Sequence, residues 1–240
     1  MVRTYSSLLV ERTIVLGFLS LIAAGALFLW GFGLLYGVPV SLLDSFFTAT
    51  SATCVTGLAV TDTALMPFPS QVTILILIQF GGLGIMTVTT ALLLFLRRRI
   101  GVREGLYLAG GLNVDSPSGA RTLVLRVWGI ALLIELAGAI LLFIGFRETL
   151  PPLRAVWFAV FHSVSAFCNA GFSLFDGNLN AYAQGILVPG TVMLLIVLGG
   201  LGFLVLYELW RLPRSREVRL SPHAALVLQV TTGLVLFGTL

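Results

Sequence analysis

Residues 52–58 have the sequence Ala-Thr-Cys-Val-Thr-Gly-Leu, and residues 166–172 have the sequence Ala-Phe-Cys-Asn-Ala-Gly-Phe. The two stretches share one spacing of alanine, cysteine and glycine, and Cys54 and Cys168 are 114 positions apart. Each follows an apolar segment too short to cross a bilayer and precedes a longer one that can. Non-helical backbone inside a membrane is tolerated where it lines a cavity, as in re-entrant pore loops. The repeated unit therefore predicts a cation-conducting pore built from repeats.

The composition is that of an integral membrane protein. Hydrophobic residues make up 58% of the chain and charged residues 10%, whereas a soluble domain has about 25% charged residues. Cytosolic, nucleic-acid-binding and secreted disulfide-rich classes are excluded on this basis. The net charge of +4 is not a nucleic-acid signal, because the arginines lie at the ends of membrane segments rather than in a patch with aromatic residues.

Four apolar runs can each cross a hydrocarbon core of about 30 Å, which takes roughly 20 helical residues. They are Ile14–Tyr36, Val72–Leu96, Leu123–Phe146 and Ile186–Trp210. Two runs of half that length are Val40–Ala52 and Leu153–Ala166, and another long run begins near Ala224. We expect an all-α membrane protein in which a membrane helix, a re-entrant pore helix with its loop, and a second membrane helix occur in tandem. The first run is longer than the roughly 7–15 residues of a signal-peptide core.

Arginine carries the whole positive-inside signal, because the chain contains no lysine. Only Arg147 and Arg154 lie on the side opposite the other arginines. Since cytoplasmic loops carry the excess of positive charge, we predict a multi-pass protein of the cell (plasma or inner) membrane with a cytoplasmic N-terminus. Both half-length segments would then enter the membrane from outside.

A second pair of motifs supports the internal repeat. Gly-Gly-Leu-Gly occurs at residues 81–84 and again at residues 199–202, where we expect it to permit close helix contact or a bend. The predicted organisation is a first repeat at 12–100, a cytoplasmic linker at 101–120, a second repeat at 121–212, a second linker at 213–222, and the start of a third repeat at 223–240. Because the last segment is incomplete, we expect a fragment or the product of a truncated gene.

The two glycine-containing turns are the candidate ion-binding elements. The carbonyl oxygens beside Gly57 and Gly171 can replace the hydration shell of a cation, and glycine accepts the backbone conformations that this requires. Asp62 and Asp176 would lie at the outer mouth, either attracting cations or as ordinary loop residues.

Asp44, Glu135 and the two cysteines also have predicted roles. Asp44 is expected to begin a half-length helix. Glu135, in the middle of a span, is either functional or a buried partner for a polar group on a neighbouring helix. The two cysteines are expected to pack as small side chains behind their turns.

The chain resembles the Trk/Ktr/HKT superfamily of potassium and sodium uptake proteins, and within it the TrkH/KtrB-like pore subunits. The resemblance is carried by residues 53–58, by residues 165–173 and by the two Gly-Gly-Leu-Gly runs, and it covers essentially the whole chain. It implies four repeats arranged pseudo-fourfold around one path, of which two are present with their filters. The implied filter residues, acting mainly through backbone carbonyls, are Val55, Thr56, Gly57, Asn169, Ala170 and Gly171.

The resemblance also implies partners. They are transported K⁺ as the ligand, with possible coupling to Na⁺ or H⁺, a cytoplasmic nucleotide-binding regulatory subunit of the TrkA/KtrA type, a second copy of the chain in a homodimer, and membrane lipid. No cofactor, enzymatic activity or nucleic-acid partner is implied.

Three alternatives to a potassium pore are a sodium-permeable transporter, a non-conducting assembly subunit and an intramembrane hydrolase. Glycine at both filter positions favours potassium, since sodium-selective members of the superfamily have serine in the first repeat, but sodium permeation and a non-conducting assembly subunit both stay open. An intramembrane hydrolase could use His162 with Ser163 or Ser165. It is disfavoured because neighbouring residues on a helix point in different directions.

Overall fold

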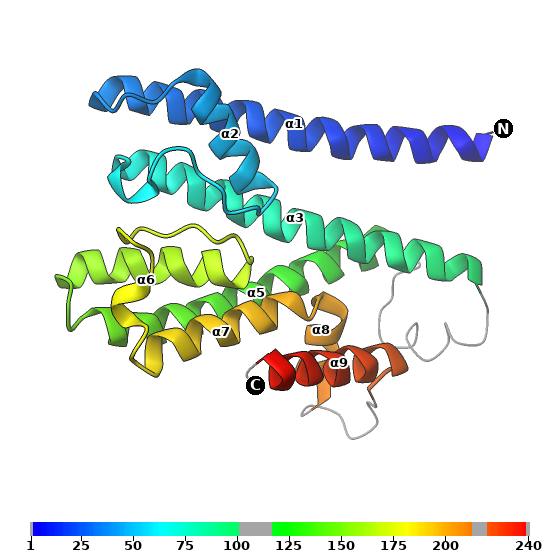
Figure 1. The fold of residues 1–240 in the computed structure, drawn as a ribbon. Helices are drawn as coiled ribbons and strands as arrows, with labels where there is room; N and C mark the ends of the chain where they lie inside the picture. Colours follow the sequence, from blue (N-terminus) through cyan, green and yellow to red (C-terminus); the bar gives the residue numbers. More distant parts are fainter. Residues whose placement is uncertain (1, 101–116, 213–219, 239–240) are drawn as a thin grey trace.

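The computed structural model describes residues 2–100, 117–212 and 220–238 of the chain, and every regular element in these ranges is helical (Figure 1). The prediction of an all-α protein is confirmed. The α-helices are α1 (Val2–Tyr36), α2 (Leu42–Thr53), α3 (Phe68–Ile100), α5 (Pro117–Phe146), α6 (Pro152–Phe167), α7 (Leu187–Gly200), α8 (Phe203–Arg211) and α9 (Pro222–Gly238). Two short 3-10 helices are η1 (Thr63–Leu65) and η2 (Asn180–Tyr182).

Two helices of the described residues are long and apolar enough to cross a membrane by themselves. These spans are Val15–Tyr36 in α1 and Leu125–Phe146 in α5, each of 22 residues. Only 22% of the first span and 39% of the second are buried inside the protein, so most of their apolar surface is open to lipid. Helices α2 and α6 have 12 and 16 residues, which is too short for a span.

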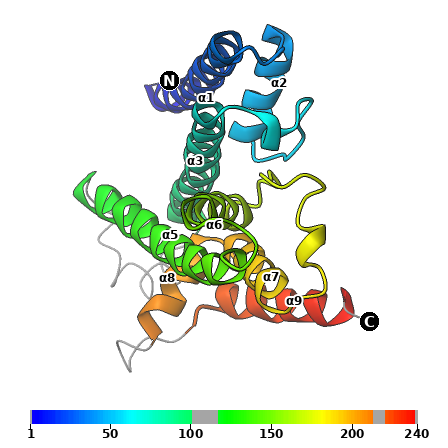
Figure 2. The same ribbon diagram turned by 90° about the vertical axis from the view of Figure 1, so that its left-hand side faces the viewer.

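The helices form two groups in chain order. Helices α1, α2 and α3 pack against one another, and α5, α6 and α7 form a second group that contacts the first through α3 (Figure 2). The segments that follow α2 and α6 lie on the same side of the molecule. The predicted repeat boundaries stay a prediction, and most of the linker at 101–120 and residues 213–219 fall outside the described residues.

The predicted span Ile186–Trp210 is not one straight helix. Helix α7 ends at Gly200, α8 begins at Phe203, and the two are bent by 103°. Gly202 allows the bend because its φ is +80°, a left-handed conformation that glycine adopts without steric cost. Gly84, at the matching place of the first motif, lies within the uninterrupted helix α3.

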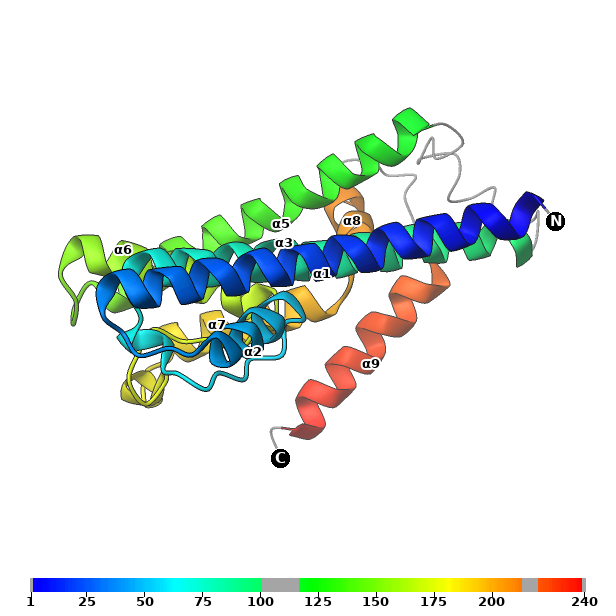
Figure 3. The same cartoon turned by 90° about the horizontal axis from the view of Figure 1, so that it is seen from above.

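Contacts of α8 hold this bend in place. The Arg126 side chain of α5 donates a hydrogen bond to the Tyr207 hydroxyl at 2.9 Å, and the Arg211 guanidinium lies over the Tyr207 ring. The buried Glu208 carboxylate accepts the Ser221 N–H at 2.9 Å, which joins α8 to the start of α9. Helix α9 is inclined to the long helices (Figure 3).

A capping box begins α2, as expected for Asp44 at a helix start. The Ser41 hydroxyl accepts the Asp44 N–H at 3.1 Å, and the Asp44 carboxylate accepts the Ser41 N–H at 3.2 Å. Two N–H groups that the helix leaves unpaired are thereby satisfied.

Ser41→Ala is expected to destabilise the protein by about 1 kcal/mol, because it removes the cap of α2. The measurement is the melting temperature of the purified protein, which should fall by about 2–4 °C. Thr50→Ala on the same helix is the control. The Thr50 hydroxyl bonds only the Phe46 carbonyl within the helix, so its loss should change little. Equal melting temperatures for Ser41→Ala and wild type would contradict the assigned cap.

Candidate functional site

The two glycine-containing turns have the same backbone hydrogen bonds. After α2, the Val55 N–H donates to the Ala52 carbonyl at 3.3 Å and the Thr56 N–H donates to the Ser51 carbonyl at 2.8 Å. After α6, Asn169 and Ala170 donate in the same way to the carbonyls of Ala166 and Ser165, at 3.0 and 2.7 Å. This pair of bonds is the Schellman motif, which ends a helix. The repeated sequence therefore forms a repeated structure.

The backbone reverses at matching residues in both turns. Val55 and Asn169 have φ of +56° and +59°, and Gly57 and Gly171 have φ of +84° and +74°. Asparagine and glycine tolerate this left-handed region, whereas a β-branched valine is strained in it. The C-terminal ends of α2 and α6 adjoin the turns, and the partial negative charge of these helix ends favours a nearby cation.

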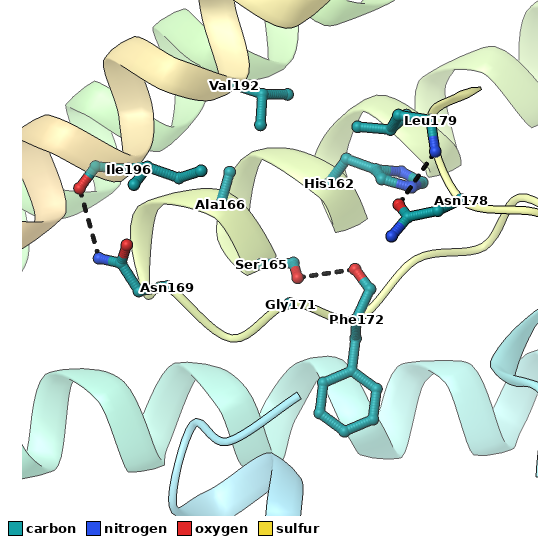
Figure 4. A pocket seen from close by; sticks show the side chains of 10 residues that line it. All are labelled: His162, Ser165, Ala166, Asn169, Gly171, Phe172, Asn178, Leu179, Val192 and Ile196. Atoms are coloured by element: carbon teal, nitrogen blue, oxygen red, sulfur yellow. Dashed lines mark hydrogen bonds between the residues drawn. The ribbon is translucent and has the colours of Figure 1, made fainter. Parts of the chain in front are cut away.

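A serine one turn before the end of each short helix fastens the chain beyond the glycine. The Ser51 hydroxyl accepts the Leu58 N–H at 2.9 Å. The Ser165 hydroxyl donates to the Phe172 carbonyl at 2.7 Å (Figure 4). Sequence analysis missed this role of both serines, although their separation of 114 positions matches that of the cysteines.

The first glycine of each Gly-Gly-Leu-Gly motif lies against the end of a short helix. A Cβ atom at Gly81 would collide with the Thr53 carbonyl oxygen, and one at Gly199 would collide with the Phe167 carbonyl oxygen. Thr53 and Phe167 are the last residues of α2 and α6. The expected close helix contact is confirmed at both motifs, and the second motif also contains the bend.

The two turns touch each other across the interface between the helix groups. A Cβ atom at Gly57 would lie 2.5 Å from the Ala170 carbonyl oxygen and 3.2 Å from the Gly171 Cα. The structure therefore brings together the residues singled out from the two repeats, and it places their backbones rather than their side chains in contact.

The cysteines differ in their surroundings. Cys168 is buried as expected, and its sulfur fills the space above Gly82 of α3, where a Cβ atom would approach it to 2.8 Å. Cys54 is exposed, so the expectation of a packed side chain is wrong for it. At Gly200, the counterpart of Gly82, a Cβ atom would meet no described atom within 4 Å. The contact of Cys168 with Gly82 thus joins the two repeats. Cys54 and Gly200, on the outer faces of the described helices, have no equivalent contact there.

The aspartates of the outer loops have different roles. Asp62 caps η1, since its carboxylate accepts the Ala64 N–H at 2.9 Å. Asp176 is exposed. Asp62 therefore serves the loop structure, and the predicted attraction of cations by either residue stays a prediction.

The histidine and serines of α6 do not form a hydrolase dyad. The His162 Nε2 atom lies 3.0 Å from the Ser173 hydroxyl and accepts the Leu174 N–H at 3.3 Å. Ser163 instead donates to the Glu135 carbonyl at 2.6 Å. His162 thus packs the back of the half-length helix and ties it to the chain that follows the second turn.

A cavity of about 260 Å³ lies beside the second turn. Figure 4 shows Asn169 and Ile196 at one end of it and His162 and Asn178 at the other. The Asn169 side-chain amide donates to the Ile196 carbonyl of α7 at 3.4 Å. The side chain of Asn169 is therefore tied to α7, and its backbone belongs to the turn.

The comparisons with known proteins agree with this geometry. The family of cation transport proteins described as TrkH matches residues 12–228. The chain belongs to this family. The TrkH family consists of transport proteins, so the prediction that the chain is not an enzyme is confirmed, as are the predicted family and the multi-pass membrane location.

Individual relatives of the TrkH family match the chain over most of its length. It is 34% identical over 222 residues to the potassium/sodium uptake protein NtpJ of Enterococcus hirae, covering 92% of this chain and 49% of NtpJ. It is 34% identical over 235 residues to the Ktr system potassium uptake protein B of Vibrio alginolyticus, covering 95% and 50% of the two chains. With the Bacillus subtilis protein of that name the identity is 37% over 194 residues, covering 80% and 43%. The chain spans about half the length of these curated relatives.

Proposed function

We propose that this chain forms two pore repeats of a membrane protein that takes up monovalent cations, with K⁺ as the main substrate. The pair of matched turns carries the proposal. Their backbones reverse at equivalent residues, touch at Gly57 and Gly171, and stand at the C-terminal ends of two half-length helices. Backbone carbonyls in such an arrangement can replace the water around a dehydrated cation.

The proposed K⁺ ligands are the backbone carbonyls of the two turns. The residues are Val55, Thr56, Gly57, Asn169, Ala170 and Gly171. Both turns end with a glycine at positive φ, which lets consecutive carbonyls take orientations that other residues resist. Two turns make half of a pseudo-fourfold filter, and further repeats would supply the rest.

The unpartnered outer faces support a ring of further repeats. The contact of Cys168 with Gly82 joins unlike faces of two similar units, and such head-to-tail contacts generate rings when they close. Cys54 is exposed and Gly200 is open, so each outer face has the half of the contact that a further repeat would complete.

The orientation and the protein partners are also proposals. The N-terminal end of α1, the C-terminal end of α3 and the N-terminal end of α5 lie at one end of the molecule (Figure 1), and the sequence places most arginines there. We assign this end to the cytoplasm by the positive-inside rule. A nucleotide-binding regulatory subunit would dock on it, and the full-length protein would form a homodimer.

Sodium transport is the second candidate. It is favoured by the similarity to NtpJ, whose name includes both potassium and sodium uptake. Glycine rather than serine at residue 57 supports potassium as the preferred ion.

The test is rubidium and sodium uptake by the full-length protein in cells that lack their own potassium uptake systems. Wild type is expected to restore uptake. Gly57→Ser and Gly171→Ser are expected to lower the preference for rubidium over sodium about tenfold or more, because serine at positive φ adds about 1–2 kcal/mol of backbone strain. At Gly57 the added Cβ atom would also lie 2.5 Å from the Ala170 carbonyl oxygen. Gly190→Ser is a matched control, since a Cβ atom there would meet no described atom within 4 Å.

Uptake with unchanged ion preference in both filter variants would remove these glycines from the ion path. Absence of monovalent-cation uptake by well-expressed wild type would favour the non-conducting subunit instead.

A further inference from the structure

The carboxylate of Glu135 is buried in the middle of the membrane span of α5, directly behind the second turn. Glu135 is 4% exposed. Its Oε1 atom lies 4.0 Å from the sulfur of Cys168, the residue that precedes Asn169 of the turn. The backbone of Glu135 is also bound to α6, because the Ser163 hydroxyl donates to the Glu135 carbonyl at 2.6 Å.

The first repeat supplies the main partner of this carboxylate. The Gln79 side chain of α3 donates from Nε2 to both Glu135 oxygens, at 3.0 and 3.2 Å. The expectation that Glu135 is a buried partner for a polar group on a neighbouring helix is thus confirmed. The contact links residues 56 positions apart and joins the two repeats beside the point where Cys168 packs on Gly82.

The hydrogen-bonding groups of Glu135 and Gln79 are only partly satisfied by this contact. The two oxygens of an ionised carboxylate offer about four acceptor sites, whereas the described residues supply one amide group and a distant thiol. The Gln79 Oε1 atom is buried and has no hydrogen-bond partner among the described residues. A glutamine at residue 135 would pair reciprocally with Gln79, satisfy that oxygen and avoid a buried charge. Buried groups that break the rule of full satisfaction are candidates for function.

We propose that Glu135 is a positioning and electrostatic residue of the second turn, whose buried negative charge raises the affinity of the Asn169–Gly171 turn for a dehydrated K⁺ ion. The charge acts from behind Cys168 through a medium of low dielectric, where attraction over several ångströms is much stronger than in water. A cation in the turn then provides the compensating charge that the described neighbours of Glu135 do not. This inference rests on the proposed function.

The test uses the purified full-length protein and measures its melting temperature as a function of K⁺ concentration. A ligand that binds only the folded protein stabilises it by RT ln(1 + L/Kd) at a ligand concentration L, so the melting temperature begins to rise when L approaches Kd. Glu135→Gln is expected to melt at or above the wild-type temperature without K⁺, because the amide pairs better with Gln79. The K⁺ concentration at which the melting temperature begins to rise is expected to increase about tenfold. Rubidium uptake should show a KM increased by the same factor.

Two further sets of variants separate charge from packing. Glu135→Asp and Glu135→Asn have equal size and differ in charge, so the asparagine variant should need about tenfold more K⁺ than the aspartate variant. If the Glu135→Gln protein cannot be produced, the aspartate and asparagine variants still test whether the charge raises the affinity for K⁺. Glu208→Gln is the control, since Glu208 is also buried but binds Ser221 at the start of α9. It should leave the K⁺ dependence unchanged.

The outcomes distinguish this inference from the proposed function. If wild type responds to K⁺ and the Glu135→Gln and Glu135→Asn variants respond at the same concentrations, the carboxylate is structural and the inference is overturned alone. If wild type neither takes up rubidium nor is stabilised by K⁺, the proposed function fails and this inference fails with it.

Discussion

Gly199→Ala is expected to abolish rubidium uptake by the full-length protein. The added Cβ atom would collide with the Phe167 carbonyl oxygen, 2.8 Å from the Phe167 carbonyl carbon and 3.1 Å from the Asn169 side-chain nitrogen. A backbone carbonyl at the end of α6 cannot yield without moving the turn that begins at the next residues. We expect destabilisation of about 3 kcal/mol or more, as for overpacking of a tight core contact.

The measurement combines uptake in cells with the melting temperature of the purified protein. Gly81→Ala should behave in the same way, because its Cβ would collide with the Thr53 carbonyl oxygen at the end of α2. Gly190 lies on the same helix as Gly199, and the Cβ atom of Gly190→Ala would have no neighbour within 4 Å among the described residues. It should be neutral or stabilising by up to about 1 kcal/mol, since alanine favours the helix. Wild-type uptake by Gly199→Ala would refute the close packing.

His162→Ala is expected to cost about 4 kcal/mol of stability. The imidazole Nδ1 donates to the Phe158 carbonyl at 2.7 Å, because the Leu174 N–H donates to Nε2. Four aromatic rings surround the imidazole, with centroids 5.1–6.0 Å from its own. Alanine would leave a large cavity and a buried N–H without an acceptor.

Loss of His162 should also lower the preference for rubidium over sodium, since Ser173 and Leu174 directly follow the second turn. Melting temperature and the ratio of the two uptake rates are the measurements. Thr48 is the counterpart of His162 in the first repeat, and its buried hydroxyl has no hydrogen-bond partner in the part of the chain that the structure describes. Thr48→Ala should therefore cost less than about 1 kcal/mol. Similar losses in both variants would contradict the tethering role of His162.

The bend at Gly202 shows where local sequence stops being informative. Gly-Gly-Leu-Gly occurs twice, yet α3 continues through Gly84 while the helix breaks before Phe203. Both glycines permit a bend, and the second has a partner for the bent form among the described residues. That partner is the Arg126 side chain, which lies 81 positions from Tyr207. A motif of four residues does not predict such a contact, because the residue that makes it is distant in the sequence.

The two cysteines also show that a local motif does not determine whether a side chain is buried. Cys54 and Cys168 occupy identical positions in matched motifs, and both were expected to be packed. Only Cys168 is buried, because Gly82 of the preceding repeat lies against it. The burial of a side chain at the edge of a repeat depends on whether a neighbouring repeat is present.

The sequence by itself determined the membrane class, the half-length helices, the repeat and the two glycine turns. These features depend on hydrophobic length and on turn residues, which act over a few neighbouring positions, and an internal repeat doubles each signal. The tertiary structure alone decided that the two turns touch, that Gln79 binds Glu135 and that His162 holds the chain after the second turn. Such contacts join distant positions, because packing selects partners by shape and by unsatisfied hydrogen bonds rather than by sequence separation.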